Sequence, residues 1–175
     1  AYRLTDARWV GRTIQEFEAS FEGQRVFVER VRQNGKLLTP TPDLRIEANA
    51  VLAIAGRREA VLERAPLIGE EVDDREVLDL ELEILDVVLT RKALVGQTLQ
   101  QLSTGDLSDN LRGVFLRRIK RTGVEMPLTL GFKLDRGDTL TLVGPRTRVE
   151  AAAPLIGYAD RDTDETDMVV MGIGI

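Results

Sequence analysis

The sequence has neither cysteine nor histidine among its 175 residues. Without cysteine the chain can form no disulfide, no thiol nucleophile and no cysteine metal site. Without histidine it lacks the commonest metal ligand and the commonest general base. It also contains no Gly-x-Ser-x-Gly motif, P-loop or dinucleotide fingerprint. We therefore predict a protein that is not an enzyme, with no catalytic residues, no metal site and no cofactor.

The sequence also has no excess of basic residues. Its 24 lysine and arginine residues are outnumbered by 29 aspartate and glutamate residues, so the net charge is −5. A protein that binds nucleic acid needs a basic face to neutralise the phosphates. We therefore expect no nucleic-acid partner. The hydrophobic share of 43% is typical of a globular protein, and the lack of cysteine agrees with a cytosolic location.

What the sequence does contain is an internal repeat. Three pairs of segments match between its halves: Gly23–Gly35 with Arg112–Gly123, Ala65–Gly69 with Ala153–Gly157, and Val10–Thr13 with Val95–Thr98. The first two pairs are related by a shift of 88 positions and the third by a shift of 85. The second copy therefore has three extra residues, which we place in the loop Ser103–Asn110. Because the repeat is longer than the roughly 20 to 50 residues of a solenoid unit, we predict a duplicated small domain.

Each copy is predicted to be an α+β unit of about four β-strands with short helices. In the second copy, strands are expected over Gly113–Ile119, Val124–Leu128 and Thr139–Val143, because β-branched or alternating apolar residues fill them. Thr122-Gly123 offers the tight turn between the first two of these strands. A helix should follow over Arg146–Ala153.

The first copy repeats this pattern, with Asn34-Gly35 at the hairpin turn. Thr13, like Thr98 in the second copy, is expected to cap a short helix. Three apolar residues of that helix are spaced for one buried face: Ile14, Phe17 and Phe21. A later helix, Arg57–Ala65, is expected to stop at Pro66.

The repeat divides the chain into four parts. These are a first domain over residues 1–69, an acidic linker over 70–76, a second domain over 77–157, and a tail over 158–175. The stretch Glu70–Asp86 has nine acidic residues and one arginine. Its first half predicts a solvated connector and its second half a strand. A cation site is the alternative, but Asp73-Asp74 lacks the ligand spacing of a calcium loop.

Both ends of the sequence indicate a piece of a longer protein. The first copy has only Tyr2–Thr5 of a strand that the second copy has in full at Leu80–Thr90. After the acidic stretch Asp160–Asp167, the eight residues Met168–Ile175 are uncharged. A spanning helix needs about 20 apolar residues, so we predict the truncated start of a membrane segment there. The alternative for the first end is a short native N-terminus. The alternative for Met168–Ile175 is a buried terminal strand.

The candidate binding residues are basic and occupy matching positions in the two copies. Arg30 and Arg32 correspond to Arg118 and Lys120 at the shift of 88. A repeated basic pair could bind a small anion such as a nucleotide phosphate. The alternative is a solvated strand end with cross-strand ion pairs. Asp138 lies in a turn without a second carboxylate at useful spacing, so we expect it to stabilise the turn rather than act as a catalytic acid.

Each copy resembles the C-terminal domain of the potassium-uptake regulator TrkA, which is also the C-terminal half of the RCK module. The second copy carries the family pattern in four segments: Val95–Leu99, Val114–Arg121, Pro127, and Gly137–Gly144. The first copy carries it in four more: Val10–Ile14, Val26–Arg32, Pro40, and Val51–Gly56. It departs from the pattern at Asn49-Ala50, where Gly-Asp would be expected. The nucleotide-binding half of an RCK module is absent.

Two such copies followed by Thr166-Asp167 and apolar residues look like the central cytosolic region of aspartate–alanine exchanger transporters. The resemblance implies a regulatory and dimerisation domain of a secondary transporter, located on the cytoplasmic side of an inner or plasma membrane. Its implied partners are membrane domains of the same parent chain and a small anionic or nucleotide ligand. We also expect the copies to pair as a pseudo-dimer within the chain, and the chain to form homodimers. The alternative function is a ligand-binding gating subunit of a potassium channel or potassium uptake system.

Overall fold

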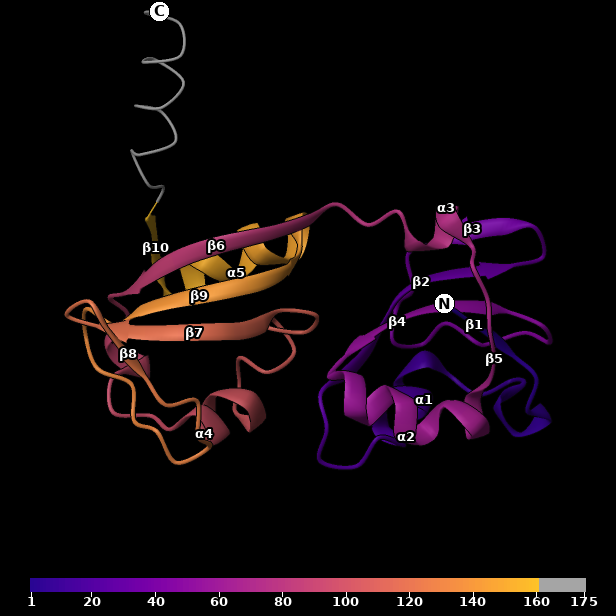
Figure 1. The fold of residues 1–175 in the computed structure, drawn as a ribbon, viewed down its shortest axis with the longest axis horizontal. Coiled ribbons are helices and arrows are strands. Elements are labelled where there is room, and N and C mark those ends of the chain that lie inside the picture. The colour runs from indigo at the N-terminus through magenta and orange to yellow at the C-terminus, as the bar shows by residue number, and fades with distance from the viewer. Residues whose placement is uncertain (161–175) are drawn as a thin grey trace, which may run out of the picture. The chain divides into compact units, whose positions relative to one another are not determined.

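The computed structural model describes residues 1–160, which fall into two compact units, Ala1–Leu80 and a second that begins at Glu81 (Figure 1). The predicted membrane entry Met168–Ile175 lies outside the described residues. Within residues 1–160, no helix is long and apolar enough to cross a membrane.

The first unit is a five-stranded antiparallel sheet with short helices. In chain order its elements are β1 (Tyr2–Leu4), η1 (Ala7–Trp9), α1 (Ile14–Ala19), β2 (Val26–Gln33), β3 (Lys36–Leu38), β4 (Val51–Gly56), α2 (Arg58–Ile68), β5 (Gly69–Glu71) and α3 (Arg75–Leu78). The strands are arranged in the order β3-β2-β4-β1-β5. The strand that is first in sequence therefore lies inside the sheet, between β4 and β5.

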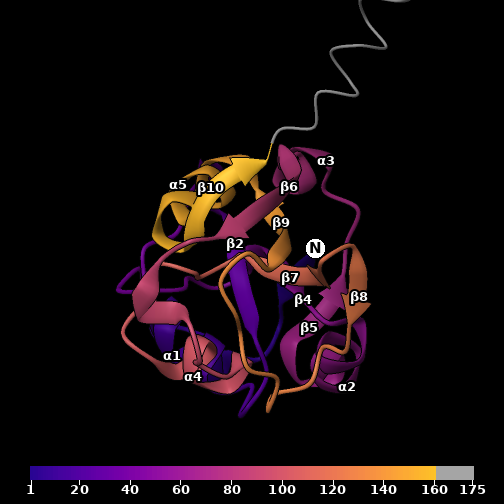
Figure 2. The same cartoon turned by 90° about the vertical axis from the view of Figure 1, so that its left-hand side faces the viewer.

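The second unit repeats this arrangement. Its elements are β6 (Leu82–Leu89), η2 (Lys92–Leu94), α4 (Leu99–Thr104), β7 (Phe115–Arg121), β8 (Val124–Met126), β9 (Thr139–Pro145), α5 (Arg146–Ile156) and β10 (Gly157–Asp160). The strand order is β10-β6-β9-β7-β8, which matches that of the first unit strand by strand. Figure 2 shows β10 lying beside β6. Only α3 has no counterpart among the described elements of the second unit.

The predicted duplication of an α+β unit is confirmed, and so are its local signals. Thr13 and Thr98 each form a capping box at the start of α1 and α4. Both hairpin turns use left-handed backbone, with φ of 51° at Asn34 and 49° at Thr122. The shift between copies is 85 up to α4 and 88 from β7 onward, so the extra residues of the second copy lie between these elements.

Each unit has one strand more than the four that the sequence pattern indicates. The additional strands, β5 and β10, are short and follow directly after a helix. Gly69 and Gly157 begin them, and a Cβ at either glycine would lie within 2.0 Å of a carbonyl oxygen on the adjacent strand. The repeated sequence Ala-Pro-Leu-Ile-Gly therefore encodes a close helix-to-strand junction. The prediction that the helix stops at Pro66 is wrong, because α2 runs to Ile68 and Pro66 lies inside its last turn, next to the exposed Leu67.

The segment 70–76 also differs from the solvated connector that its charge predicts. Its first residues belong to β5, which pairs with β1. Asp74 then caps α3 by accepting a hydrogen bond from the Val77 backbone N–H at 3.2 Å. Most of this acidic stretch is thus built into the first unit. The contacts that hold it there involve residues of β2 and are described below.

In both units the main core lies on one face of the sheet, beneath the longer helices. In the first unit Phe17 of α1 and Ile68 of α2 pack against strand residues such as Leu4 and Leu52. In the second unit Val149 and the rest of the buried face of α5 pack in the same way on β6 and β9. The alternation of strand residues turns the remaining side chains to the opposite side, which we call the open face.

Candidate site on the open faces

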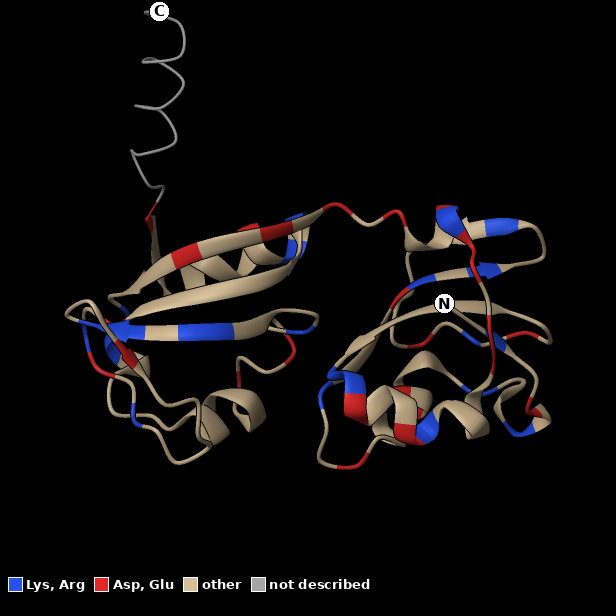
Figure 3. Cartoon of the chain, in the orientation of Figure 1, with Lys and Arg blue, Asp and Glu red and all other residues tan. Residues whose placement is uncertain are grey.

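The predicted basic residues lie on the open faces of the two units. Arg30 and Arg32 flank the buried Val31, so both point away from the core. Arg118 and Lys120 flank the buried Ile119 in the same way. We call them the first and the second basic pair. Figure 3 shows lysine and arginine along β2 and β7, the strands that carry these pairs.

Strand register places the two pairs in equivalent surroundings. In the first unit Arg30 stands opposite Ala53, and Arg32 stands opposite Val51. In the second unit Arg118 stands opposite Thr141, and Lys120 opposite Thr139, each 88 positions later. A β-bulge precedes the first member of each pair, at Val28/Arg30 and at Leu116/Arg118.

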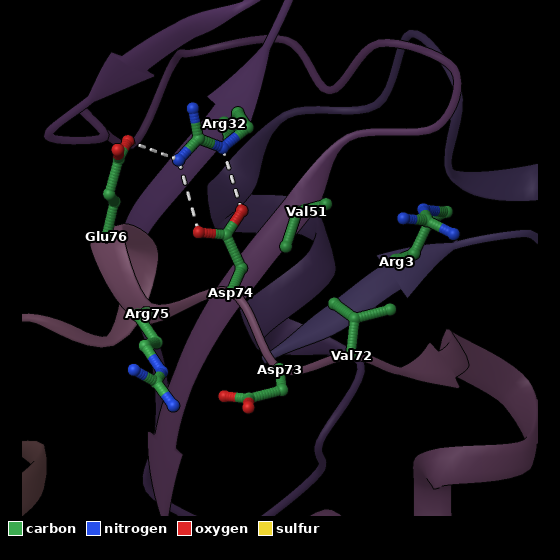
Figure 4. Close-up of a pocket in the computed structure, with 8 residues that line it drawn as sticks. All are labelled: Arg3, Arg32, Val51, Val72, Asp73, Asp74, Arg75 and Glu76. Atoms are coloured by element: carbon green, nitrogen blue, oxygen red, sulfur yellow. Dashed lines mark hydrogen bonds and ion pairs between the residues drawn. The ribbon is translucent and has the colours of Figure 1, made fainter.

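Both members of the first basic pair bind the chain's own acidic segment, and Figure 4 shows the contacts of Arg32. Arg32 binds Asp74 in a two-pronged ion pair, with Nε–Oδ2 of 2.8 Å and Nη2–Oδ1 of 3.1 Å. Its Nη2 also donates to Glu76 Oε2 at 2.8 Å. Arg30 Nη1 donates to two backbone carbonyls, those of Glu76 at 3.1 Å and Asp79 at 2.8 Å. Five hydrogen bonds therefore hold α3 to β2.

An apolar contact completes this attachment. Val77 of α3 is fully buried and packs on Val51 and Ala53 of β4, next to Val72. Together these residues form a small second core on the open face of the first unit. The same segment lines a pocket with Arg3, Arg32 and Asp73 (Figure 4). Arg32 in this pocket is already paired with two carboxylates, and the three arginines of the lining are matched by three acidic residues, so the pocket has no net charge to attract an added anion.

The second basic pair has no such partner among residues 1–160. The Nε atom of Arg118 is buried and makes no hydrogen bond there. The strand positions beside Arg118 carry polar side chains. Thr141 is buried, and its hydroxyl donates to Asp86 Oδ1 at 2.5 Å. A buried, unpaired guanidinium nitrogen is costly to keep. In the described part of the chain, Arg118 is thus the member of the four predicted residues best placed to receive an anionic group.

A third basic residue of β7 has a structural role. Arg121 binds the carboxylate of Asp138 through Nε at 2.8 Å and Nη2 at 2.9 Å, and Asp138 is only 1% exposed. Asp138 also accepts the backbone N–H of Asp135 at 2.8 Å, and Arg121 donates to the Lys133 carbonyl at 3.1 Å. Burial raises the pKa of Asp138, but these hydrogen bonds outweigh it and hold the pKa below its usual value. Asp138 therefore fixes the turn before β9, as the sequence predicts.

The chain's relationships to known proteins follow this architecture. The TrkA-C domain family matches residues 1–69 and again 84–157, and these two matches cover most of the chain. The chain belongs to the TrkA-C domain family.

Its relatives are longer proteins. An uncharacterized transporter of Bradyrhizobium diazoefficiens is 36% identical over 176 residues, which is 100% of this chain and 33% of that protein. Uncharacterized transporters of Bordetella parapertussis and Shewanella oneidensis are 33% and 34% identical, over 30% and 32% of their lengths. The chain thus spans about a third of the length of the curated relatives it matches. A solved structure titled "Crystal Structure of the GsuK RCK domain" matches 81% of the chain with a TM-score of 0.32 and 11% identity, values too low to support a comparison of sites.

The two TrkA-C copies hold the loop before β4 and before β9 with different residues. In the first copy Gln33 takes the place of Arg121, and Ala50 takes that of Asp138. The Gln33 amide donates to the Arg45 carbonyl at 3.1 Å and its oxygen accepts the Glu47 N–H at 3.2 Å. One neutral side chain therefore binds both backbone groups that the second copy binds with an ion pair. This also accounts for Ala50 in place of Asp138, while Asn49 keeps the left-handed backbone of Gly137, with φ of 60° against 89°.

Sequence reasoning did not identify the partners of the first basic pair. Asp74 and Glu76 lie more than 40 positions after Arg32, and charge alone placed them in a solvated linker. The exchange of Gln33 and Ala50 for Arg121 and Asp138 was visible in the aligned copies. That paired change is the sequence signal that could have revealed the contact between Arg121 and Asp138.

The ion pair between α3 and β2 predicts a pH-dependent attachment. The hydrogen bond from Arg32 lowers the pKa of Asp74 below its ordinary value. Because the pKa of Asp74 is lower in the folded form, its ionisation stabilises that form at pH values above the unfolded pKa of about 3.9. This stabilisation is lost as the pH falls through the folded pKa. We expect the Val77 amide resonance to move toward its unfolded position below about pH 4. In Asp74→Asn this step should be absent. A Val77 resonance with the same acid step in both proteins would contradict the assignment.

Proposed function

We propose that the chain is the regulatory and dimerisation region of a secondary transporter of the aspartate–alanine exchanger kind. It would lie on the cytoplasmic side of the inner or plasma membrane and act on membrane domains of the same parent chain. The observation that carries this proposal is similarity over the whole chain to proteins named transporters, of which it spans about a third. A potassium gating subunit is less well supported, because these relatives are named transporters.

The geometry supports regulation by an anionic group at the second basic pair. Arg118 and Lys120 lie on an open sheet face, and Arg118 Nε has no hydrogen-bond partner within residues 1–160. The first basic pair is occupied by Asp74 and Glu76 and would serve to fix α3. The two TrkA-C copies would then have separate tasks. The pair in the first copy would hold α3, and the pair in the second copy would be the site of regulation.

The transport proposal can be tested with the longer protein that would contain this chain. Reconstituted into liposomes loaded with alanine, it is expected to take up labelled aspartate, and liposomes without internal alanine should show much less uptake. Internal alanine is needed because the binding site of an exchanger returns across the membrane only with a counter-substrate bound. Aspartate uptake that does not depend on internal alanine, or no amino-acid uptake at all, would overturn the exchanger assignment.

A further inference from the structure

The first basic pair shows what kind of group this position on the sheet binds. Arg32 holds two carboxylates that lie two residues apart, Asp74 and Glu76. Arg30 holds two backbone carbonyls of the same segment. An isolated small anion would offer acceptors to Arg32 but none of these main-chain carbonyls. In the first copy, the ligand of the basic pair is therefore a stretch of acidic polypeptide.

The second copy presents the same arrangement of positions. The row Glu70–Arg3–Val51–Arg32 across β5, β1, β4 and β2 becomes Tyr158–Val88–Thr139–Lys120 across β10, β6, β9 and β7. The basic pair again stands beside β-strand partners on the face away from the core. What is missing within residues 1–160 is any element that corresponds to α3. The apolar side chains of Ile84 and Tyr158 on this face are exposed by 57% and 58%.

The strand residues on which Val77 packs in the first copy also differ in the second copy. In the first copy Val77 packs on Val51 and Ala53. The corresponding residues of the second copy are Thr139 and Thr141, and Thr141 is hydrogen-bonded to Asp86. A polar floor does not favour an apolar anchor, because burying a hydroxyl against a methyl group without a partner costs free energy. The occupant expected here therefore carries a polar residue after its two carboxylates, at the position of Val77.

We propose that the open face of the second TrkA-C copy binds an acidic segment of polypeptide, with two carboxylates two residues apart and a polar residue after them. This rests on the proposed function only in assigning an effector site to Arg118 and Lys120. Arg118 carries most of the binding, since Glu125 faces Lys120 across the β7–β8 register. The occupant that we assign is the chain's own segment 161–168. Asp162 and Asp164 follow Asp74 and Glu76 by 88 positions, the shift that relates Lys120 to Arg32.

The test uses the full chain carrying Asp162→Asn and Asp164→Asn, so that its own acidic residues do not compete. A synthetic peptide of sequence RDTDETDM is titrated into the labelled protein, and amide resonances are followed. We expect saturable shifts at β7 and β9 around Arg118 and Thr141. Adding Arg118→Glu and Lys120→Glu should weaken the peptide at least about tenfold, because charge-assisted hydrogen bonds are lost and like charges face each other. The neutral peptide RNTNQTNM should not bind.

A matched control separates this site from a general effect of net charge. Lys92→Glu with Arg136→Glu makes the same change in charge at exposed positions outside the open face, and should leave peptide affinity within about twofold. Tighter binding to the Asn-substituted chain than to the unsubstituted chain would support the proposal and identify the chain's own segment as the occupant. Equal affinities would show that the chain's own segment does not occupy the face, and would contradict that assignment.

Two further results would overturn the proposal. In the first, the peptide shifts no resonance of the open face in either protein. In the second, inorganic phosphate competes with the peptide as well as the peptide competes with itself, so that a free anion accounts for the site. The second result would leave the proposed regulatory function in place, while a failed exchange assay would leave this binding result untouched. The two proposals can therefore fail separately.

Discussion

Replacing Arg121 by glutamine is expected to lower the free energy of unfolding of the second unit by about 3 kcal/mol. The carboxylate of Asp138 is 1% exposed and would lose both hydrogen bonds from the guanidinium. A buried charge without its partner is among the most destabilising changes known in folded proteins. We place the cost at the lower end of the usual range because the Arg121 side chain is itself 35% exposed.

The first copy supplies the rescue for this substitution. Arg121→Gln combined with Asp138→Ala recreates the Gln33 and Ala50 arrangement, in which an amide binds both turn groups. The double variant should recover more than half of the lost stability. Urea unfolding followed by amide resonances of the second unit measures the loss, and fluorescence of Trp9, the only tryptophan, reports the first unit as an internal control. A double variant no more stable than Arg121→Gln would contradict the equivalence of the two arrangements.

Gly157→Ala is expected to destabilise the second unit by more than about 3 kcal/mol. An added Cβ would lie 1.8 Å from the Val88 carbonyl oxygen and 2.9 Å from the Thr90 nitrogen. Both atoms are backbone, so relief requires β10 to move away from β6 rather than a side chain to rotate. Hydrogen exchange should show lost protection at the amides that pair these strands. Gly69→Ala should have the same effect on β5, where the Cβ would lie 2.0 Å from the Arg3 carbonyl oxygen.

Gly131→Ala is the matched control, because nothing lies within 4 Å of its added Cβ and the residue is exposed. It should change stability by less than about 1 kcal/mol. If Gly157→Ala were as mild as Gly131→Ala, the helix-to-strand junction would not depend on the absence of a side chain. The repeated Ala-Pro-Leu-Ile-Gly sequence would then need another explanation.

The sequence predicts those parts of the fold that depend on neighbouring residues. Hairpin turns at Asn34 and Thr122, and the caps at Thr13 and Thr98, are local and were recognisable from a few residues each. Strands β5 and β10 were not, since three or four residues show no usable alternation and pair with strands distant in sequence.

The unpredicted part of the site depends on a long-range ion pair. Asp74 and Glu76 belong to a stretch whose composition is typical of a solvated linker. Their attachment to β2 depends on Arg30 and Arg32 and on the apolar contact between Val77 and β4. None of these signals is adjacent in sequence.

The attachment of α3 also sets the length of the tether between the two units. With α3 held on β2, only residues 79–81 separate the end of the helix from the start of β6. If α3 were released, the free chain would run from the end of β5 to the start of β6, over residues 72–81. At about 3.3 to 3.6 Å per extended residue, its reach would grow from about 10 Å to more than about 30 Å. The Arg32–Asp74 ion pair thus keeps the linker between the units short. Acid or a competing acidic peptide would break this ion pair and lengthen the linker.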